Sequence, residues 1–409
     1  MRRSALPRST ISRRIAMLTV LLSSVAWAGS AGKVLYRFPG GRHGNLPLAG
    51  VVFDDAGNMY GTTYDGGVYG WGTVFELSRS ATGWKQLVLY SFMGSTDGAN
   101  PAANLIFDSA GNLYGTTTAG GSSQCGDGCG TVFRLSLSNG MWRHTVLYSF
   151  AGTPSDGSGP VGLAMGAKMQ LYGTTGAGGN NSQCSSGCGT VFALTPANGG
   201  WTETVLYSFA GYPDGDGPSS GVILDKAGNL YGETSAGGKT NGGTVFELSH
   251  SAKGWKEVLI YTFIQNQGDP LGGLVFDKTG SLYGATEFGP QEEGYGAIFR
   301  LTHSRSGWTE SVLHAFGGAD GLYPRSGVIL DSIGNVYGTT AEGGSKNLGA
   351  VFELKYETWN ESVLYSFLGN SEGDDPEASL TFGPNGNLYG TSSSELSRFY
   401  GGTVFEVKP

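Results

Sequence analysis

Residues 107–121 read FDSAGNLYGTTTAGG, and close copies of this stretch return along the whole chain. The LYGTT part recurs every 52 to 59 residues, centred on seven tyrosines: Tyr60, Tyr114, Tyr172, Tyr231, Tyr283, Tyr337 and Tyr389. Two further phrases, GTVFEL and VLYSF, recur with the same spacing. A fixed period of this length predicts a solenoid or a propeller rather than a string of unrelated domains.

Each repeat carries four strand signals, which we name A to D in chain order. Strand A is the short apolar run before the quoted Asp-x-x-Gly-Asn turn, strand B is LYGTT, strand C is TVFEL, and strand D runs from a Trp to VLYSF. In that turn Asp108 opens the chain reversal and Gly111 supplies the positive φ. Four antiparallel strands per repeat are typical of a propeller blade. We expect the recurring Trp of strand D to pack one blade against the next.

The two ends of the repeat region are complementary. Residues 34–38, VLYRF, read as a D strand with no A, B or C before it, and residues 402–407, GTVFEV, read as a C strand with no D after it. Pairing them would close a ring and remove two exposed strand edges. The sequence therefore predicts an all-β fold: a single seven-bladed β-propeller over residues 33–409, closed by the N-terminal strand joining the last blade.

The combination D-x-x-G-N-L-Y-G-T-T, G-T-V-F-E-L, G-W and V-L-Y-S-F resembles the GloVer tandem repeat, which occurs in exported bacterial proteins called choice-of-anchor repeat proteins. The resemblance covers residues 33–409. It implies a repeat architecture and export, and it brings no established activity. Members of that family are often tethered by a C-terminal anchor, whereas this sequence ends at Val407-Lys408-Pro409 and we expect no anchor.

Residues 1–28 read as a signal peptide that is cleaved on export. Five arginines precede a short apolar run, and Ala26-Trp27-Ala28 matches a cleavage site; an uncleaved membrane anchor is the alternative. Without those arginines the mature chain has a net charge of −13, because 20 basic residues face 33 acidic ones. We expect a secreted, periplasmic or cell-surface monomer with no membrane span in the mature chain. Such acidity argues against nucleic acid as a partner.

The four cysteines lie in the B–C connections of two adjoining repeats. Cys125 and Cys129 occur as CGDGC, and Cys184 and Cys188 occur as CSSGC. In an exported chain these spacings predict two local disulfides. A single four-cysteine zinc site is the alternative, and it would require the two loops to converge.

The longer and more variable B–C and D–A connections share one rim of the predicted ring, which we call the B–C/D–A rim. Variable loops on a rigid scaffold commonly carry function, so we expect the site there. Several D–A loops contain an acidic turn, which either shapes the loop as an Asx turn or binds cations. These turns are Asp97-Gly98, Asp156-Gly157, Asp214-Gly215, Asp269-Pro270, Asp320-Gly321 and Asp374-Asp375. No cofactor is expected, and calcium at Asp214 and Asp216 is a further metal hypothesis.

Aromatic residues gather in the B–C loops of the first and last repeats, which ring closure makes neighbours. We predict a ligand-binding patch for a glycan or peptide there, and shielding of the closing seam is the alternative. Its members are Tyr64, Asp65, Tyr69 and Trp71 in the first repeat and Arg398, Phe399 and Tyr400 in the last.

Catalytic motifs are missing from the sequence: there is no G-x-S-x-G, H-E-x-x-H, P-loop or dinucleotide fingerprint. The acids that could act as catalytic carboxylates at the channel mouth are Glu233, Glu287 and Glu342; simple surface solvation is the alternative. We therefore predict a binding or scaffold protein that recognises an extracellular or envelope glycan, peptide or protein, more in keeping with a non-enzyme. The second hypothesis is a polysaccharide-active hydrolase or lyase.

Overall fold

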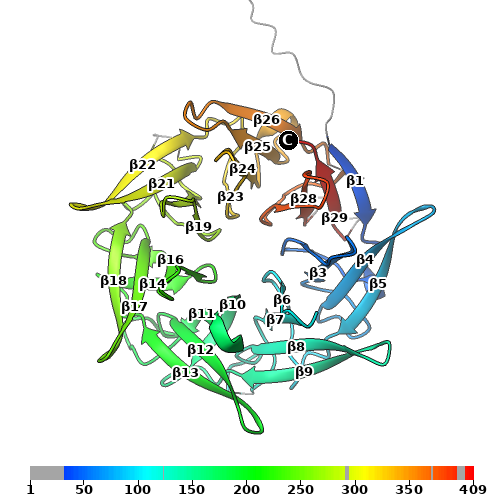
Figure 1. The fold of residues 1–409 in the computed structure, drawn as a ribbon, viewed down its shortest axis with the longest axis horizontal. Helices are drawn as coiled ribbons and strands as arrows, with labels where there is room; N and C mark the ends of the chain where they lie inside the picture. Colours follow the sequence, from blue (N-terminus) through cyan, green and yellow to red (C-terminus); the bar gives the residue numbers. More distant parts are fainter. Residues whose placement is uncertain (1–31, 123, 291–293, 370–371, 394–400) are drawn as a thin grey trace, which may run out of the picture.

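A computed structural model describes residues 32–122, 124–290, 294–369, 372–393 and 401–409. These residues form seven small antiparallel sheets arranged in a ring, as blades of a propeller (Figure 1). The predicted fold class is confirmed. Three single-turn 3-10 helices within the described residues interrupt the strands: η1 (Gly41–His43), η2 (Ala167–Met169) and η3 (Gly344–Lys346).

The two inner strands of each blade are A and B. The A strands are β2 (Val52–Phe53), β6 (Ile106–Phe107), β10 (Gly157–Met165), β15 (Ile223–Leu224), β19 (Val275–Phe276), β23 (Ile329–Leu330) and β27 (Thr381–Phe382). The B strands are β3 (Met59–Thr63), β7 (Leu113–Thr117), β11 (Leu171–Gly178), β16 (Leu230–Gly237), β20 (Leu282–Thr286), β24 (Val336–Thr340) and β28 (Leu388–Ser392). In blade 4 a further short strand, β14 (Gly215–Pro218), pairs with β16 beside β15.

The two outer strands are C and D. The C strands are β4 (Thr73–Ser80), β8 (Thr131–Ser138), β12 (Thr190–Ala197), β17 (Thr244–Ser251), β21 (Ala297–Ser304), β25 (Ala350–Leu354) and β29 (Thr403–Val407). The D strands are β5 (Gly83–Ser91), β9 (Met141–Ser149), β13 (Gly200–Ser208), β18 (Gly254–Thr262), β22 (Gly307–Ala315), β26 (Glu361–Ser366) and β1 (Gly32–Arg37).

Ring closure occurs as the sequence predicts. Strand β1 pairs antiparallel with β29, from Gly32 opposite Val407 to Arg37 opposite Thr403, and completes the sheet of β27 and β28. The C-terminus therefore lies beside β1 (Figure 1). An ion pair of 3.0 Å between Lys33 Nζ and Glu406 Oε2 joins the same two strands.

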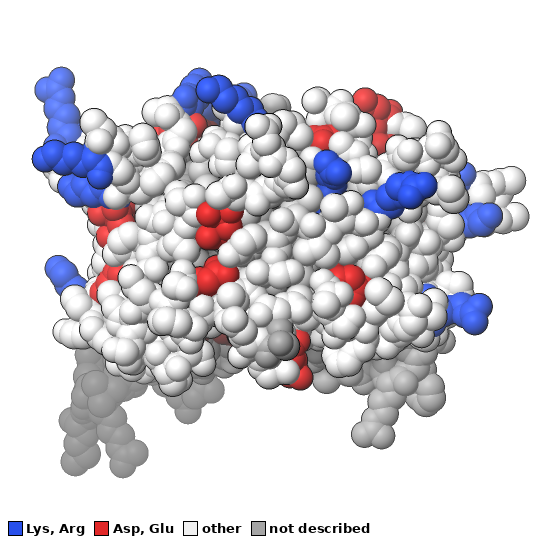
Figure 2. All heavy atoms as spheres, turned by 90° about the horizontal axis from the view of Figure 1, so that it is seen from below, with Lys and Arg blue, Asp and Glu red and all other residues white. Residues whose placement is uncertain are grey.

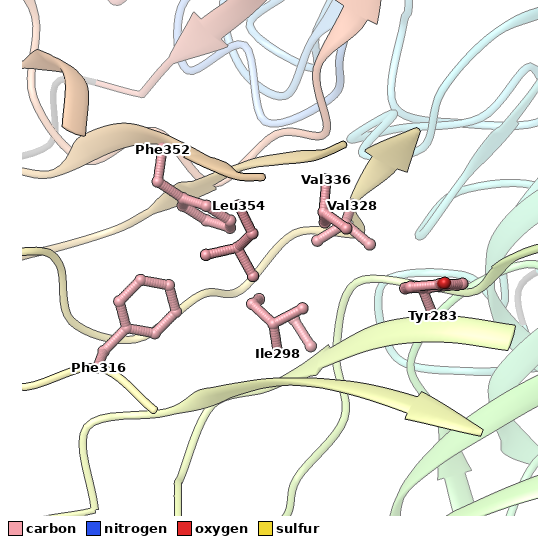
Figure 3. Packing of buried hydrophobic residues seen from close by; sticks show 8 residues of the cluster. Tyr283, Ile298, Phe316, Val328, Val336, Phe352 and Leu354 are labelled. Atoms are coloured by element: carbon pink, nitrogen blue, oxygen red, sulfur yellow. The ribbon is translucent and has the colours of Figure 1, made fainter. Parts of the chain in front are cut away.

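The hydrophobic core lies between the blades rather than inside them. The described residues form seven buried clusters, and each cluster draws side chains from two neighbouring blades. Figure 3 shows the cluster between blades 5 and 6, to which blade 5 gives Tyr283, Ile298 and Phe316 and blade 6 gives Val328, Val336, Phe352 and Leu354. A single blade therefore has no core of its own.

The recurring Trp residues pack between blades, as predicted. The Tyr of one LYGTT strand meets the Trp of the next blade's D strand, with ring centroids 6.1 to 6.4 Å apart. The pairs are Tyr60–Trp142, Tyr114–Trp201, Tyr172–Trp255, Tyr231–Trp308 and Tyr283–Trp359. Trp84 of the first blade packs against the cluster that contains Tyr389 of the last, so the closing interface follows the same pattern.

The A–B turn depends on one carboxylate. Asp108 accepts hydrogen bonds from the backbone of Ala110 and Asn112, from the Asn112 side chain and from the Tyr114 hydroxyl. Blade 7 has Gly383 at this position, and there the carboxylate comes instead from strand C.

In blade 7, Glu406 accepts hydrogen bonds from the side chains of Asn385, Asn387 and Tyr389. Burial alone would raise the pKa of Glu406, but these hydrogen bonds and Lys33 outweigh it and hold that pKa at about 2. The carboxylate that shapes this turn is therefore also the one that Lys33 of β1 contacts.

We predict that Glu406→Gln weakens ring closure. The variant should lose about 1–3 kcal/mol in free energy of unfolding at pH 7, because three donors and Lys33 lose a charged acceptor. The group's pKa is depressed in the fold, so this advantage should be present above about pH 4.5 and disappear as the pH falls towards 2. Urea unfolding at pH 7 and pH 3 measures both effects.

Glu247→Gln is the matched control, because Glu247 has the same place in strand C of blade 4, where Asp225 already serves the turn. Equal losses of stability in the two variants at pH 7 would contradict the closing role of Glu406.

Candidate functional site

The B–C/D–A rim is tied together by a repeated backbone contact. The residue before the Pro of each D–A loop has a positive φ of 53 to 64°, and its N–H donates to a carbonyl in the preceding blade's B–C loop at 2.8 to 3.1 Å. These contacts are Leu46 to Gly401, Asn100 to Trp71, Gly159 to Cys129, Gly217 to Cys188, Asp269 to Gly242, Tyr323 to Tyr295 and Asp375 to Leu348. The rim is therefore a hydrogen-bonded frame, on which side chains can be held in fixed positions.

The residue after that Pro leads into the innermost strand of each blade, and in all seven blades it is partly exposed. It therefore lies at the inner edge of each blade on this rim. The seven residues are Leu48, Ala102, Val161, Ser219, Leu271, Arg325 and Glu377. Only blades 6 and 7 have a charged residue here, so the ring of otherwise similar blades is asymmetric at this place.

Arg325 joins three successive blades through two ion pairs. Its Nε donates to Glu287 Oε1 of blade 5 at 2.8 Å, and its Nη1 donates to Glu377 Oε1 of blade 7 at 2.7 Å. Burial lowers the pKa of Arg325, but Glu377 and Glu287 outweigh burial and raise it, so the guanidinium stays charged. Of the predicted acids, Glu287 thus belongs to this ion-pair group, and its catalytic role stays a prediction. Arg325 and Glu377 were not predicted, although a charge at a position that is small or apolar in the other repeats was a readable signal.

Asp269 lies beside this group. Its backbone carbonyl accepts from Glu287 N–H, and one of its buried carboxyl oxygens has no hydrogen-bond partner. Burial, and then the charge of Glu287, raises the pKa of Asp269 to about 6. This part of the rim therefore combines a carboxyl group whose pKa burial raises with the ion pairs of Arg325 to Glu287 and Glu377.

The aromatic loop of blade 1 also lies on this rim. Tyr69 is 56% exposed and Trp71 is 42% exposed. The Trp71 ring covers Gly94 of the D–A loop, where an added Cβ would meet it at 2.4 Å. Asp65 accepts a hydrogen bond from the Asn100 side chain, and burial raises its pKa. Trp71 thus both packs and presents a ring surface, while Tyr69 projects into solvent.

The remaining part of the predicted aromatic patch cannot be placed beside this loop. Arg398, Phe399 and Tyr400 lie outside the described residues, and a patch shared by blades 1 and 7 stays a prediction. Tyr64 lies in blade 1 at the register position that Glu287 occupies in blade 5, just after strand B, and its N–H donates to Leu46.

The two predicted disulfides are confirmed. Cys125 is bonded to Cys129 and Cys184 to Cys188. All four cysteines are used within their own loops, which is incompatible with the four-cysteine zinc alternative. Each disulfide packs beside a glycine of the D–A loop, Gly152 or Gly211, as Trp71 packs on Gly94 in blade 1. The disulfides therefore pack against the D–A loops at the position that the Trp71 ring takes in blade 1.

The acidic turns of the D–A loops form hydrogen bonds with groups of the blade that precedes the loop. Asp97, Asp156 and Asp214 each accept hydrogen bonds from the Tyr of the preceding VLYSF strand and from a backbone N–H. His314, which replaces that Tyr in blade 5, contacts Asp320 at 2.9 Å in the same way. These carboxylates therefore shape the loops.

Two aspartates assigned to this series from the sequence belong to other positions. Asp269 precedes the Pro directly, and in blade 6 Glu372, not Asp374, accepts from the Tyr365 hydroxyl. The loop that holds Asp269 is shorter than that of blade 1, whereas Glu372 has the same spacing from its Tyr as Asp97 and Asp374 lies beyond it.

The calcium hypothesis concerns Asp214 and Asp216. Asp214 Oδ2 already accepts from Tyr207 and Ala210, and burial raises the pKa of Asp216. Asp216 also lies close to the sulfurs of Cys184 and Cys188, but those sulfurs are bonded to each other. Calcium binding stays a prediction.

Glu233 does not lie at the channel mouth, contrary to the sequence-based expectation. It is 0% exposed and accepts from Gly273 N–H of the next blade at 2.9 Å, while its Oε1 has no hydrogen-bond partner. Thr174 and Thr391 occupy its register position in blades 3 and 7 and likewise bond to the next blade's backbone. Burial raises the pKa of Glu233 to about 8. Glu233 lies between two blades because its register position in strand B faces the next blade, as the threonines at the same position do.

Glu342 lies on the rim, where its backbone pairs with Leu322. Its Oε2 is 3.5 Å from Asn347 Nδ2, and the two ion pairs of Arg325 are made with other acids. The three predicted acids are therefore not gathered in one place.

We predict that Glu233→Gln removes a loss of folding stability that the parent protein shows at high pH. A buried acid with a raised pKa stabilises the fold below about pH 4.5 and loses that contribution as the pH rises to about 8. The variant should match the parent at pH 5 and be about 1–3 kcal/mol more stable at pH 9, because no charge has to be buried. Urea unfolding at the two pH values tests this, with Glu342→Gln as the exposed control. A parent and variant with parallel pH profiles would refute it.

The structure defines the class of this protein as a seven-bladed β-propeller made of tandem repeats. The model of the Gloeobacter/Verrucomicrobia repeat matches residues 20–185, 127–330 and 258–409. The chain therefore belongs to this repeat family, and the resemblance read from the sequence is confirmed. A search of curated proteins found no match.

Solved structures share the fold at low sequence identity. A putative 6-phosphogluconolactonase from Bacteroides uniformis is 16% identical with a TM-score of 0.52, over 81% of this chain and 88% of that one. PorZ of Porphyromonas gingivalis, a surface component of the type-IX secretion system, is 13% identical with a TM-score of 0.51, over 89% of this chain and 46% of that one. At these identities the likeness shows the fold alone.

Two properties of the described residues bear on partners. None of their helices has the length and apolar character needed to cross a bilayer. On the side seen in Figure 2, their basic side chains lie apart from one another rather than forming a continuous patch.

Proposed function

We propose that this protein is an exported binding or scaffold propeller that recognises an extracellular or envelope glycan, peptide or protein on its B–C/D–A rim. The observation that carries the proposal is where the repeats differ. Their strands are near copies, whereas blade 1 presents the exposed aromatic loop and blades 5 to 7 present the Arg325 group on one rim. Selection for a scaffold alone gives no reason to place these exceptions together on one face.

Export is part of this proposal. It is supported by the predicted signal peptide, which lies outside the described residues, and by two disulfides, which persist in oxidising compartments. The mature chain would then act in the periplasm, at the cell surface or in the medium.

The test is binding of the mature protein to glycan and peptide arrays. Tyr69→Ala should weaken binding about tenfold or more if the aromatic loop contacts the ligand, because exposed aromatic side chains commonly dominate recognition. Leu137→Ala is the control, since Leu137 is also exposed, at 57%, but lies near the C–D turn on the opposite rim. Thermal unfolding of both variants checks that the fold survives.

Trp71→Ala is a second test of the same loop, although this substitution also removes the ring that packs on Gly94. If neither aromatic substitution changes any array signal, the loop is not the contact surface. A protein with no array signal at all would count against the proposal as a whole.

A polysaccharide hydrolase or lyase is the second candidate function. One observation favours it: Asp269 and Glu287 are adjacent on this rim, and burial together with the charge of Glu287 raises the pKa of Asp269, as suits a general acid. Turnover of a polysaccharide panel that falls by more than about a hundredfold in Asp269→Asn and Glu287→Gln would support it. Turnover that is absent, or is unchanged in both variants, would reject it.

A further inference from the structure

An aromatic cluster adjoins the Arg325 group on the rim of blades 5 and 6. The Phe288 and Tyr323 rings lie 6.3 Å apart, and Tyr295 and Tyr323 lie 6.4 Å apart, both in edge-to-face arrangements. Phe288 is 36% exposed. Phe288 follows Glu287 directly and Tyr323 precedes Arg325 by two residues, so the rings and the ion pairs are carried by the same two stretches of the rim. Blades 2 to 4 have small or uncharged residues at the equivalent positions.

The hydrogen-bonding capacity of this surface is partly unused. The two ion pairs occupy two of the five guanidinium N–H groups of Arg325. Each of Glu287 and Glu377 gives one oxygen to the guanidinium and keeps its second as a further acceptor site. Side-chain exposures of 36% for Arg325, 15% for Glu287 and 25% for Glu377 leave all three within reach of a ligand.

The charges select among ligand classes. One arginine stands against two glutamates, with Asp269 beside them, so an anionic ligand would meet net repulsion. A cationic ligand would have to compete with Arg325, which already occupies the space between the two carboxylates. Neutral hydroxyl groups meet neither obstacle, because each can donate to a carboxylate and accept from the guanidinium.

We propose that Phe288, Tyr323, Glu287, Arg325 and Glu377 form a binding subsite for a neutral sugar ring. The aromatic side chains pack against the apolar face of the ring, and the ion-pair group holds neighbouring hydroxyls. This inference rests on the proposed rim-binding function and names its ligand class: an uncharged glycan, bound on the blades 5 to 7 side of the rim. Tyr295 supports Tyr323 from behind through its ring contact and its carbonyl.

The test uses the full mature chain and an array of immobilised neutral oligosaccharides, matched oligosaccharides containing uronic acids, and peptides. We expect binding to at least one neutral glycan, with affinity reduced about tenfold or more in Phe288→Ala and in Arg325→Ala. Binding should change less than about twofold between 50 and 500 mM salt, because a neutral ligand gains little from screened charges. Glu377→Gln serves as a milder variant that keeps side-chain volume should Arg325→Ala fail to fold.

Leu48→Ala is the matched control, since Leu48 holds the register position of Arg325 in blade 1; its affinity should be unchanged. The inference is overturned if only uronic-acid glycans bind, or if neutral glycans bind Phe288→Ala and Glu377→Gln as tightly as the parent. Binding that is lost in Tyr69→Ala alone would overturn it while leaving the proposed function standing. Absence of all array binding would remove both.

Discussion

Every hydrophobic cluster that the described residues form lies between two blades, so no blade can be stable without neighbours on both sides. The consequence is a ring, because an open stack would leave two unpaired faces. The pairing of β1 with β29 supplies the last interface, and Lys33, Glu406 and the turn of blade 7 meet there. Rim, channel and loop frame all take their geometry from that closed circle.

Most of the fold could be predicted from the sequence because the strand pattern of one blade recurs along the chain. Seven copies of LYGTT set the blade number, the unmatched phrases at the two ends implied closure, and the Trp at fixed register implied blade-to-blade packing. The CGDGC and CSSGC spacings led to the two disulfides. In each case one local pattern was seen several times, and repetition averaged out the ambiguity of any single copy.

The candidate site was less accessible, for physical reasons that differ between residues. Glu233 looked like a surface acid, but strand register turns it into the neighbouring blade. Asp269 looked like one of the loop-shaping aspartates, but its loop is shorter and places it next to Glu287. Arg325 and Glu377 each follow the proline of a D–A loop, a position to which the sequence analysis gave no role. They come close to Glu287 only in the folded ring. Contacts between repeats depend on loop lengths, which repetition does not encode.

The joining of the first strand to the last has a consequence for how the molecule comes to exist. Gly32 pairs with Val407, so the earliest strand of the propeller must wait for almost the entire polypeptide before it finds its partner. Folding thus ends with one contact of very long sequence separation, a slow kind of event. Until then both β1 and the free edge of β29 are open to intermolecular strand addition. A cell that makes this propeller therefore has to prevent chains with unclosed rings from pairing with one another.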